Sequence, residues 1–242
     1  NDLNGVRVSG SVTFNQTWYA NLPYVIEGGL TINSGPALTL QPGTVVKFKD
    51  TGSYLTVNGA LVADGTTDAP IVFTSLRDDS VGGDTDNDDG IFWPAPGDWQ
   101  RITFGDSSDD SRSLLRHVQV RYGGSYYGQS VVLDSAAPRV ISSTIAYGSG
   151  HGLYLTNQAN PPVEANTFLQ NGASGLYITG SSAPTVRNNA FRRNGAYAVE
   201  MTAESNPRFS GNTALDNAYN GAKVTGTVAG ATTWDADLAY VL

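Results

Sequence analysis

Apolar residues in the second half of the chain recur at a fixed spacing, which prolines mark most clearly. Four successive prolines stand 23 residues apart: Pro138, Pro161, Pro184 and Pro207. Three apolar columns keep the same register: Val140, Val163, Val186 and Phe209; Leu153, Leu176, Val199 and Ala222; and Leu155, Ile178, Met201 and Val224. A period of this length is typical of solenoids, in which each unit buries its apolar side only against its neighbours.

The residue types within each repeat favour strands over helices. β-Branched and aromatic residues dominate, asparagine, glycine and proline punctuate them, and apolar residues do not follow the spacing of an amphipathic helix. Two polar columns share the register: Asn166, Asn189 and Asn212; and Asn171, Asn194 and Asn217. The pattern predicts a β-helix in which one repeat is one coil. The apolar columns point inward, and the asparagine columns form ladders of side-chain amides at turns.

The first part of the chain shows the same organisation with a slightly longer period. Leu30 and Leu55 are predicted to be equivalent, as are Val46 and Ile71, and the members of each pair are 25 residues apart. The coils are then interrupted by one long excursion over residues 76–98. Loops longer than about 15 residues without secondary structure are uncommon and are usually functional or disordered.

The segment 8–26 recurs as 224–242, with nine of nineteen positions identical and no gap. Two accounts fit: the ends are related caps, or 224–242 opens the next copy of a repeating unit. We favour the second, which makes this chain part of a longer tandem polypeptide. The predicted single β-helix domain, 1–242, has N-terminal coils at 1–75, an acidic loop at 76–98, middle coils at 99–137, regular coils at 138–226, and the next unit or a cap at 227–242.

Composition narrows the class of protein and of partner. With 15% charged residues, 28 glycines and 11 prolines in 242 residues, the chain is typical of a turn-rich all-β protein and not of a disordered one. The net charge of −8 disfavours nucleic acid and anionic membrane surfaces as partners and suits divalent cations. The absence of cysteine excludes a disulfide scaffold, thiol catalysis and cysteine-ligated zinc. No apolar run is long enough for membrane insertion.

Several stretches in the first hundred residues resemble a known family. They include Pro42-Gly43-Thr44, Asp64-Gly65-Thr66, Ala69-Pro70-Ile71 and Gly97-Asp98-Trp99. They are similar to the right-handed parallel β-helix modules of large secreted bacterial surface proteins, which share the pectin-lyase-like fold. The resemblance implies an all-β, right-handed, single-stranded parallel β-helix of about nine to ten coils and an extracellular location. It implies little about activity, because one scaffold hosts many functions.

The loop at 76–98 carries the sharpest chemical signal. Six carboxylates lie within twelve residues: Asp78, Asp79, Asp84, Asp86, Asp88 and Asp89. Carboxylates packed this closely repel one another unless a cation lies among them, and Ca²⁺ takes six to eight oxygen ligands. We expect Asp84, Asp86 and Asp88 to bind calcium, with Asp78 or Asp79 completing the shell. In the resembling modules such a loop also looks like a structural calcium site; the alternative is a solvated acidic loop.

Catalytic motifs of this fold are incomplete. His151 lies in a Gly-His-Gly triplet that polygalacturonases also carry, but the aspartates that accompany it there are missing. Glycosidases of the usual type need two carboxylates across the scissile bond, and no two acids recur in one column of the repeats. Glu164 stands one coil before Arg187, which predicts a cross-coil ion pair. These observations leave catalysis open and favour a non-catalytic protein.

Tyrosines provide a second candidate site. Tyr154 and Tyr177 occupy the same repeat position between inward residues, so both are expected to point outward, about 4.8 Å apart. Tyr122, Tyr126 and Tyr127 are candidates to extend the row. Aromatic rings on a rigid sheet can contact sugar rings, whereas the alternative is cross-strand stacking that only covers the sheet.

Together these features predict a non-catalytic, calcium-stabilised module of a secreted or cell-surface bacterial protein, serving as a stalk, an adhesin or a carbohydrate-binding surface. The alternative is a polysaccharide-active enzyme, a lyase or a glycoside hydrolase, on the same fold. The expected partner is a polysaccharide or other glycan, with no nucleic acid and no membrane insertion.

Overall fold

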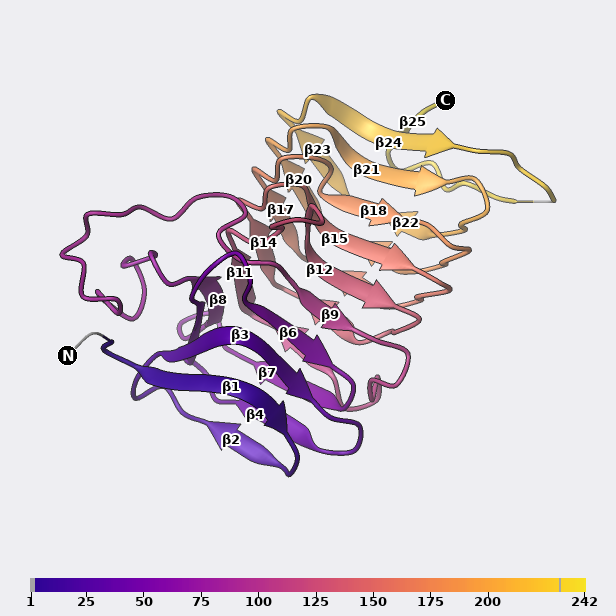
Figure 1. Cartoon of the computed structure of the whole chain (residues 1–242). Coiled ribbons are helices and arrows are strands. Elements are labelled where there is room, and N and C mark those ends of the chain that lie inside the picture. The colour runs from indigo at the N-terminus through magenta and orange to yellow at the C-terminus, as the bar shows by residue number, and fades with distance from the viewer. Residues whose placement is uncertain (1–2, 231) are drawn as a thin grey trace.

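The computed structural model describes residues 3–230 and 232–242, and over these residues the chain consists of strands and turns without a helix. The chain winds into about nine stacked turns, from β1 at one end to β24 and β25 at the other (Figure 1). Neighbouring turns are joined by parallel strand pairs, as between β15 and β18 or between β16 and β19. The predicted parallel β-helix is confirmed.

Three columns of strands run along the stack, and turns join each column to the next. The first column contains β1 (Val6–Val12), β3 (Tyr24–Ile32), β6 (Tyr54–Val57), β9 (Ile102–Phe104), β12 (Gln129–Asp134), β15 (His151–Thr156), β18 (Leu176–Ile178), β21 (Tyr197–Thr202), β24 (Tyr219–Thr225) and β25 (Ala239–Val241). The second continues from β3 through β5 (Val45–Phe48), β8 (Ile71–Ser75), β11 (Val118–Arg121), β14 (Thr144–Ala146), β17 (Thr167–Leu169), β20 (Ala190–Arg192) and β23 (Thr213–Leu215). The third is a separate sheet of β2 (Gln16–Trp18), β4 (Ala37–Leu40), β7 (Ala60–Asp64), β10 (Leu114–Arg116), β13 (Arg139–Ile141), β16 (Pro162–Glu164), β19 (Thr185–Arg187) and β22 (Arg208–Ser210).

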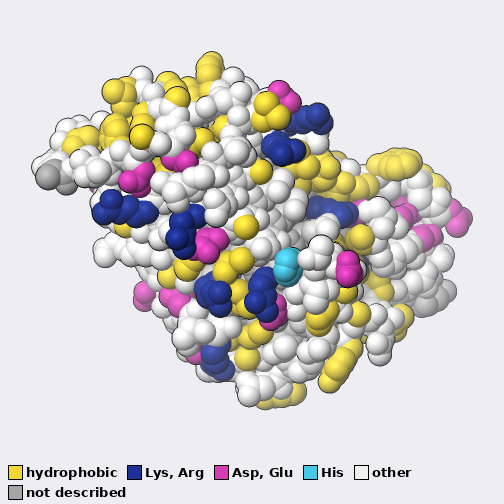
Figure 2. Space-filling view, turned by 180° about the vertical axis from the view of Figure 1, so that it is seen from behind, with side chains coloured by type: hydrophobic (Ala, Val, Ile, Leu, Met, Phe, Trp, Pro, Cys, Tyr) yellow, Lys and Arg dark blue, Asp and Glu magenta, His cyan; other side chains and the backbone are white. Residues whose placement is uncertain are grey.

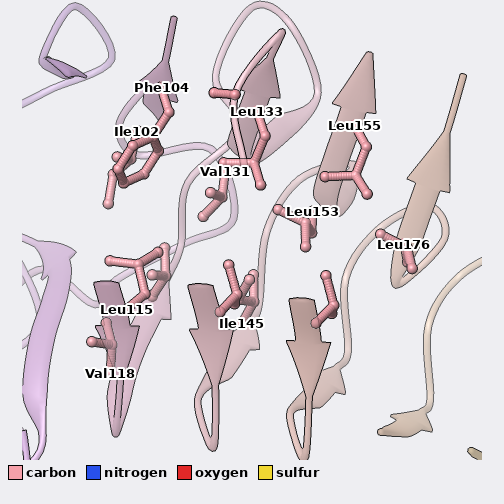
Figure 3. Packing of buried hydrophobic residues seen from close by; sticks show 14 of the residues in the cluster. Ile102, Phe104, Leu115, Val118, Val131, Leu133, Ile145, Leu153, Leu155 and Leu176 are labelled. Carbon is pink, nitrogen blue, oxygen red and sulfur yellow. The ribbon is translucent and has the colours of Figure 1, made fainter. Parts of the chain in front are cut away.

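The predicted apolar columns form the core. Leu153 pairs with Leu176 and Leu155 with Ile178 in neighbouring strands, and all four side chains are fully buried. Side chains of β9, β12 and β15 face those of Leu115, Val118 and Ile145 across the interior (Figure 3). The buried cluster extends without a break through the stack. Since each coil covers the apolar side chains of the next, hydrophobic burial holds the coils in register.

The predicted asparagine ladders are also present. The Asn166 backbone N–H and side-chain amide both donate to Oδ1 of Asn189, over 2.9 and 3.1 Å, and the same amide donates to the Val140 carbonyl over 2.8 Å. Asn189 repeats this arrangement with Asn212 in the next coil. Ser143 begins the ladder in place of an asparagine. Every buried amide of the ladder therefore has its partners in the adjacent coils.

One predicted register in the first part of the chain is wrong. Leu30 pairs with Leu55 as expected, but Val46 pairs with Phe73 and not with Ile71. The turn between β7 and β8 is longer than the turn that precedes β5, which shifts the pairing by two residues. A two-residue shift preserves the alternation of inward and outward side chains, so the sequence pattern cannot distinguish the two registers.

The two similar segments share structure as well as sequence. Trp18 stacks on Tyr24 with ring centroids 4.2 Å apart, and Trp234 stacks on Tyr240 at 5.0 Å. The strand pairings correspond too, because Val6 pairs with Tyr24 in the first segment and Ala222 with Tyr240 in the second. The same side-chain contact thus organises both ends of the stack.

Candidate functional site

The loop at 76–98 leaves the stack between β8 and β9 and projects from its side near the N-terminal end (Figure 1). Both of its ends are anchored. Asp98 accepts a hydrogen bond from Ser75 over 2.7 Å and forms an ion pair with Arg77 at 3.3 Å. Immediately after the loop, the buried Trp99 ring stacks on Phe48 at 3.8 Å. The rigid coils therefore hold the two ends of the loop together and leave its middle free to form a site.

Three aspartates converge within this loop. One carboxylate oxygen from each of Asp79, Asp84 and Asp86 lies within 4.8 Å of the other two. Oxygens bound to one Ca²⁺ at about 2.3–2.6 Å lie at most about 5 Å apart, so the cluster has the dimensions of a calcium site. The Oδ1 atoms of Asp79 and Asp86 are buried without a hydrogen-bond partner. Such atoms are rare, because a buried carboxylate oxygen without a donor is costly.

Burial and the neighbouring carboxylates also shift the pKa values of two aspartates in the cluster, Asp79 and Asp86. Burial is the main cause that raises the pKa of Asp79, and the neighbouring carboxylates of Asp84, Asp88 and Asp78 raise it further, against the opposing charge of Lys47. Burial also leads the causes that raise the pKa of Asp86, and the nearby acids add to it. Both groups would be stabilised by a positive charge placed among them.

Lys47 is a residue of this site that sequence reasoning missed. It lies on β5 with its side chain fully buried beneath the loop, and its ammonium donates to the Gly83 carbonyl over 2.8 Å. Burial lowers the pKa of Lys47, while Asp79 and other acids of the loop oppose that shift. Within the described residues no carboxylate reaches its Nζ within ion-pair distance. The one available signal was a lysine that alternates with the inward residues Val46 and Phe48 of β5.

Asp78 has a different role from the cluster. Its carboxylate accepts hydrogen bonds from Thr74 over 2.6 Å and from Ser80, and it forms an ion pair with Arg121 at 3.2 Å. Burial alone would raise the pKa of Asp78, but the hydrogen bonds from Ser80 and Thr74 and the charge of Arg121 outweigh it and lower that pKa. The buried Asp78 thus ties the base of the loop to β8 and β11.

The remaining predicted ligands close turns of the loop. Asp84 accepts hydrogen bonds from the backbone N–H groups of Asp88 and Asp89, each over 3.1 Å. Asp88 in turn accepts from the N–H groups of Gly90 over 2.7 Å and Phe92 over 3.1 Å. Asp89 is exposed at a positive φ of 57°. Of the six predicted aspartates, the structure brings Asp79, Asp84 and Asp86 together, and Asp88 and Asp89 shape the turn beside them.

A cavity lies between the loop and the coils. Its volume is about 370 Å³, and it is lined by Arg77, Asp78, Asp79, Ser80, Gly90, Phe92, Trp93, Pro94 and Tyr122. The coil side supplies Tyr122, from the turn after β11, and the loop side supplies two highly exposed aromatic rings, Phe92 and Trp93. Asp79 lines this cavity and also belongs to the carboxylate cluster.

The predicted tyrosines fall into separate groups. Tyr154 and Tyr177 pair in register and meet edge to face with centroids 5.3 Å apart. Tyr122 instead stacks on Tyr147 at 5.3 Å, beside the loop. The remaining two occupy the turn before β12, where the Tyr127 ring lies 4.1 Å from the Arg101 guanidinium and the Tyr126 hydroxyl lies 3.4 Å from Thr51.

His151 lies next to the Tyr154 and Tyr177 pair. Its ring centroid is 4.9 Å from that of Tyr177, and its Nδ1 accepts a hydrogen bond from the Ser174 backbone N–H over 3.3 Å. Burial lowers the pKa of His151, against the charge of Glu200. The predicted ion pair between Glu164 and Arg187 is confirmed at 2.7 Å.

On the reverse side of the molecule, charged side chains of both signs are interspersed (Figure 2). Arg116 makes two hydrogen bonds of 2.6 Å to Asp64 in a neighbouring coil. Arg116 and Arg187 thus each form a cross-coil ion pair. The unbalanced negative charge of the molecule is concentrated in the loop at 76–98, which has seven aspartates and a single arginine.

Parallel coils, inward apolar columns and asparagine ladders define the class of parallel β-helix proteins. Two family models cover the chain: residues 108–233 match the right handed beta helix region, and residues 10–133 match the pectate-lyase like beta helix domain. The chain therefore belongs to the right-handed β-helix family. No curated protein and no solved structure matches it. In the described part of the chain, no helix is long and apolar enough to cross a membrane.

Proposed function

We propose that this chain is a non-catalytic β-helix module of a secreted or cell-surface bacterial protein, and that calcium bound by Asp79, Asp84 and Asp86 stabilises its loop at 76–98. The observation that carries the proposal is the convergence of Asp79, Asp84 and Asp86, each of which places one carboxylate oxygen within 4.8 Å of the other two. Asp79 and Asp86 each also have a buried Oδ1 without a hydrogen-bond partner. A hard divalent cation bound among the three carboxylates would offset their mutual repulsion.

Lys47 does not replace that cation. A single ammonium is present against the carboxylates of the cluster, and its hydrogen bond goes to the Gly83 carbonyl. Backbone carbonyls and water would complete a calcium shell of six to eight oxygens. The hydrogen bonds that Asp84 accepts from the backbone N–H groups of Asp88 and Asp89 would then couple the ion to the outer part of the loop.

Calcium titration of the whole chain by isothermal calorimetry tests this proposal. We expect one saturable calcium site, a melting temperature that falls in excess EDTA, and loss of both effects in a variant with Asp84→Asn and Asp86→Asn. The matched control is Asp89→Asn, which changes an exposed loop aspartate outside the cluster. Identical melting in EDTA and in millimolar calcium would rule out a structural calcium.

The rigid stack supports a role as a stalk or adhesin, and its exposed rings support contact with carbohydrate. Tyr154 and Tyr177 lie side by side on outward positions of β15 and β18 and are half-buried rather than covered. If the rings of Tyr154 and Tyr177 form a sugar-contacting surface, we expect the chain to bind glycans on a glycan array and the Tyr177→Ala variant to lose that binding. A pure stalk would give no glycan signal.

The match to a pectate-lyase-like domain supports a second candidate, a polysaccharide-active enzyme. In that case the surface beside Tyr177 offers Glu200, which pairs with it in register, and the neighbouring His151. Incubation with acidic polysaccharides would then produce new reducing ends or unsaturated uronates. Their absence at high enzyme concentration would leave the non-catalytic module.

A further inference from the structure

The cavity between loop and coils has the size and lining of a small-molecule site. Its volume of about 370 Å³ lies at the low end of the range for ligand pockets, about 300–1,000 Å³. The loop contributes Phe92, Trp93 and Pro94, and the coils contribute Tyr122. An apolar cavity with a few converging polar groups is the arrangement that binds small ligands, and its size restricts the ligand to a compact group.

The charged groups around the cavity leave one carboxylate, that of Asp79, without an ion-pair partner among the described residues. Arg77 is paired with Asp98 at 3.3 Å, and Asp78 is paired with Arg121 at 3.2 Å. Asp79 has no ion pair within the described residues, and its Oδ1 has no hydrogen-bond partner. The surrounding aspartates of the loop add to the negative potential, so the cavity repels anions and attracts cations.

The aromatic rings favour the same sign of ligand. The face of an aromatic ring is electrostatically negative, and tryptophan attracts cations most strongly. The Arg77 guanidinium already lies 5.7 Å from the centroid of Phe92. Trp93 is 82% exposed, and in the part of the chain described here no side-chain cation lies over its ring. Trp93 is therefore available to an external cation.

We propose that this cavity binds the alkylated ammonium group of a small molecule, with Trp93 facing the cation and Asp79 supplying the opposite charge. An alkylated ammonium combines an apolar surface, which suits the rings and Pro94, with a diffuse positive charge that loses little hydration on entering an aromatic site. A primary ammonium or a metal ion lacks that apolar surface.

This site is distinct from the calcium cluster, although Asp79 contributes to both. Asp84 and Asp86 do not line the cavity, whereas the aromatic residues do not belong to the cluster. Titrations of the wild-type chain both in saturating calcium and in EDTA therefore separate the two proposals. Ammonium binding without any calcium binding would contradict only the calcium site, and calcium binding without ammonium binding would contradict only the cavity.

The test uses choline and tetramethylammonium as probes, and 3,3-dimethylbutan-1-ol as the uncharged analogue of choline with the same shape. We expect saturable binding of both cations by calorimetry, and binding of the uncharged analogue weaker by about tenfold or more, since the cation–π and carboxylate attraction is lost. Trp93→Ala is expected to weaken choline binding by about tenfold.

The matched control is Phe14→Ala, which removes another highly exposed aromatic ring at a turn far from the loop in sequence. Its choline affinity is expected to stay within about twofold of wild type, because Phe14 does not line the cavity. Because Trp93 is exposed, we expect its replacement to leave the fold intact. No saturable binding in either condition, equal affinity for the uncharged analogue, or unchanged affinity in Trp93→Ala would each overturn the proposal.

Discussion

The regular coils and the loop at 76–98 both bury polar groups, and they satisfy them in opposite ways. In the coils, Asn166 and Asn189 sit in the interior of turns, and each finds its donors and acceptors in the adjacent coil. In the loop, the buried Oδ1 atoms of Asp79 and Asp86 have no partner from the protein. The asparagine ladders are therefore satisfied within the protein, whereas the loop leaves buried acceptors beside which we propose that calcium binds.

The difference follows from repetition. Identical amides at one position in successive coils can each donate to the coil on one side and accept from the coil on the other, so a ladder closes on itself. Identical carboxylates cannot do this, because they only accept hydrogen bonds and repel one another. Neutral amides in the repeat thus pair with one another and stabilise the stack, whereas the carboxylates of the loop cannot pair with one another in this way.

Removing one rung of the ladder should give the largest effect. Asn189→Ala leaves the Asn166 amide and backbone N–H without their acceptor and the Val163 carbonyl without its donor. At about 1–3 kcal/mol for each buried group left unpaired, we expect a loss of about 3–5 kcal/mol in unfolding free energy, measured by chemical denaturation. Asn160 is exposed, and its side chain accepts a hydrogen bond from the Ala183 backbone N–H, so Asn160→Ala should lose less than about 1 kcal/mol. Equal losses would mean that the ladder is not a special source of stability.

Calcium binding should give the next largest change in stability, and this change should arise from the loop at 76–98. At a calcium concentration about one hundred times the Kd, the native state gains about 2.7 kcal/mol. For a chain of this size that corresponds to a rise in Tm of about 5–10 °C, measured by calorimetry against EDTA. The Asp84→Asn and Asp86→Asn variant should melt at the same temperature in both buffers. A calcium effect that survives in this variant would place the ion elsewhere.

The pH dependence of stability should change sign with calcium. In EDTA, the raised pKa values of Asp79 and Asp86 mean that the folded loop holds more protons than the unfolded chain. Stability should then increase as pH falls from neutral through these raised values towards pH 4, by less than about 1 kcal/mol because solvent screens the partly exposed groups. With calcium bound, protons compete with the ion, so stability should fall over the same range. Melting curves at pH 7 and pH 5 in both buffers measure the two slopes.

The smallest change in stability is expected for an exposed ion pair, because water can solvate both charged groups when the pair is broken. Glu164→Gln removes the ion pair with Arg187. The side chain of Glu164 is 30% exposed and that of Arg187 is 52% exposed. Exposed pairs contribute about 0.2–1 kcal/mol, so we expect a change below about 0.5 kcal/mol that vanishes in high salt, measured by denaturation at two ionic strengths. A loss as large as that of Asn189→Ala would show that charged pairs stabilise the coils as strongly as the ladder does.

The architecture was largely predictable because equivalent residues recur at the same position in successive coils, so each inter-coil contact is indicated by several pairs of residues. One apolar column, such as Leu153 and Leu176, could be a coincidence, but three columns and two asparagine ladders in one register leave a parallel β-helix as the consistent solution. In the first part of the chain, where the period is irregular, the predicted strand register is less accurate. Val46 was assigned to Ile71 and pairs with Phe73, since a shift by two residues keeps every side chain on its own face.

The candidate site was predictable only as a segment. The density of aspartates indicated a candidate site in residues 76–98. Their spacing did not show that Asp78 would instead bond to Thr74 and Arg121, or that Asp79 would lie beside Asp84 and Asp86. Nor did it show that Lys47 lies beneath them, or that Trp93 and Tyr122 enclose a cavity. By itself the sequence determined the periodic part, because there each contact joins equivalent residues in neighbouring coils. Only the tertiary structure decided the site, because an irregular loop has no period, and its contacts depend on how its path in space meets the coils.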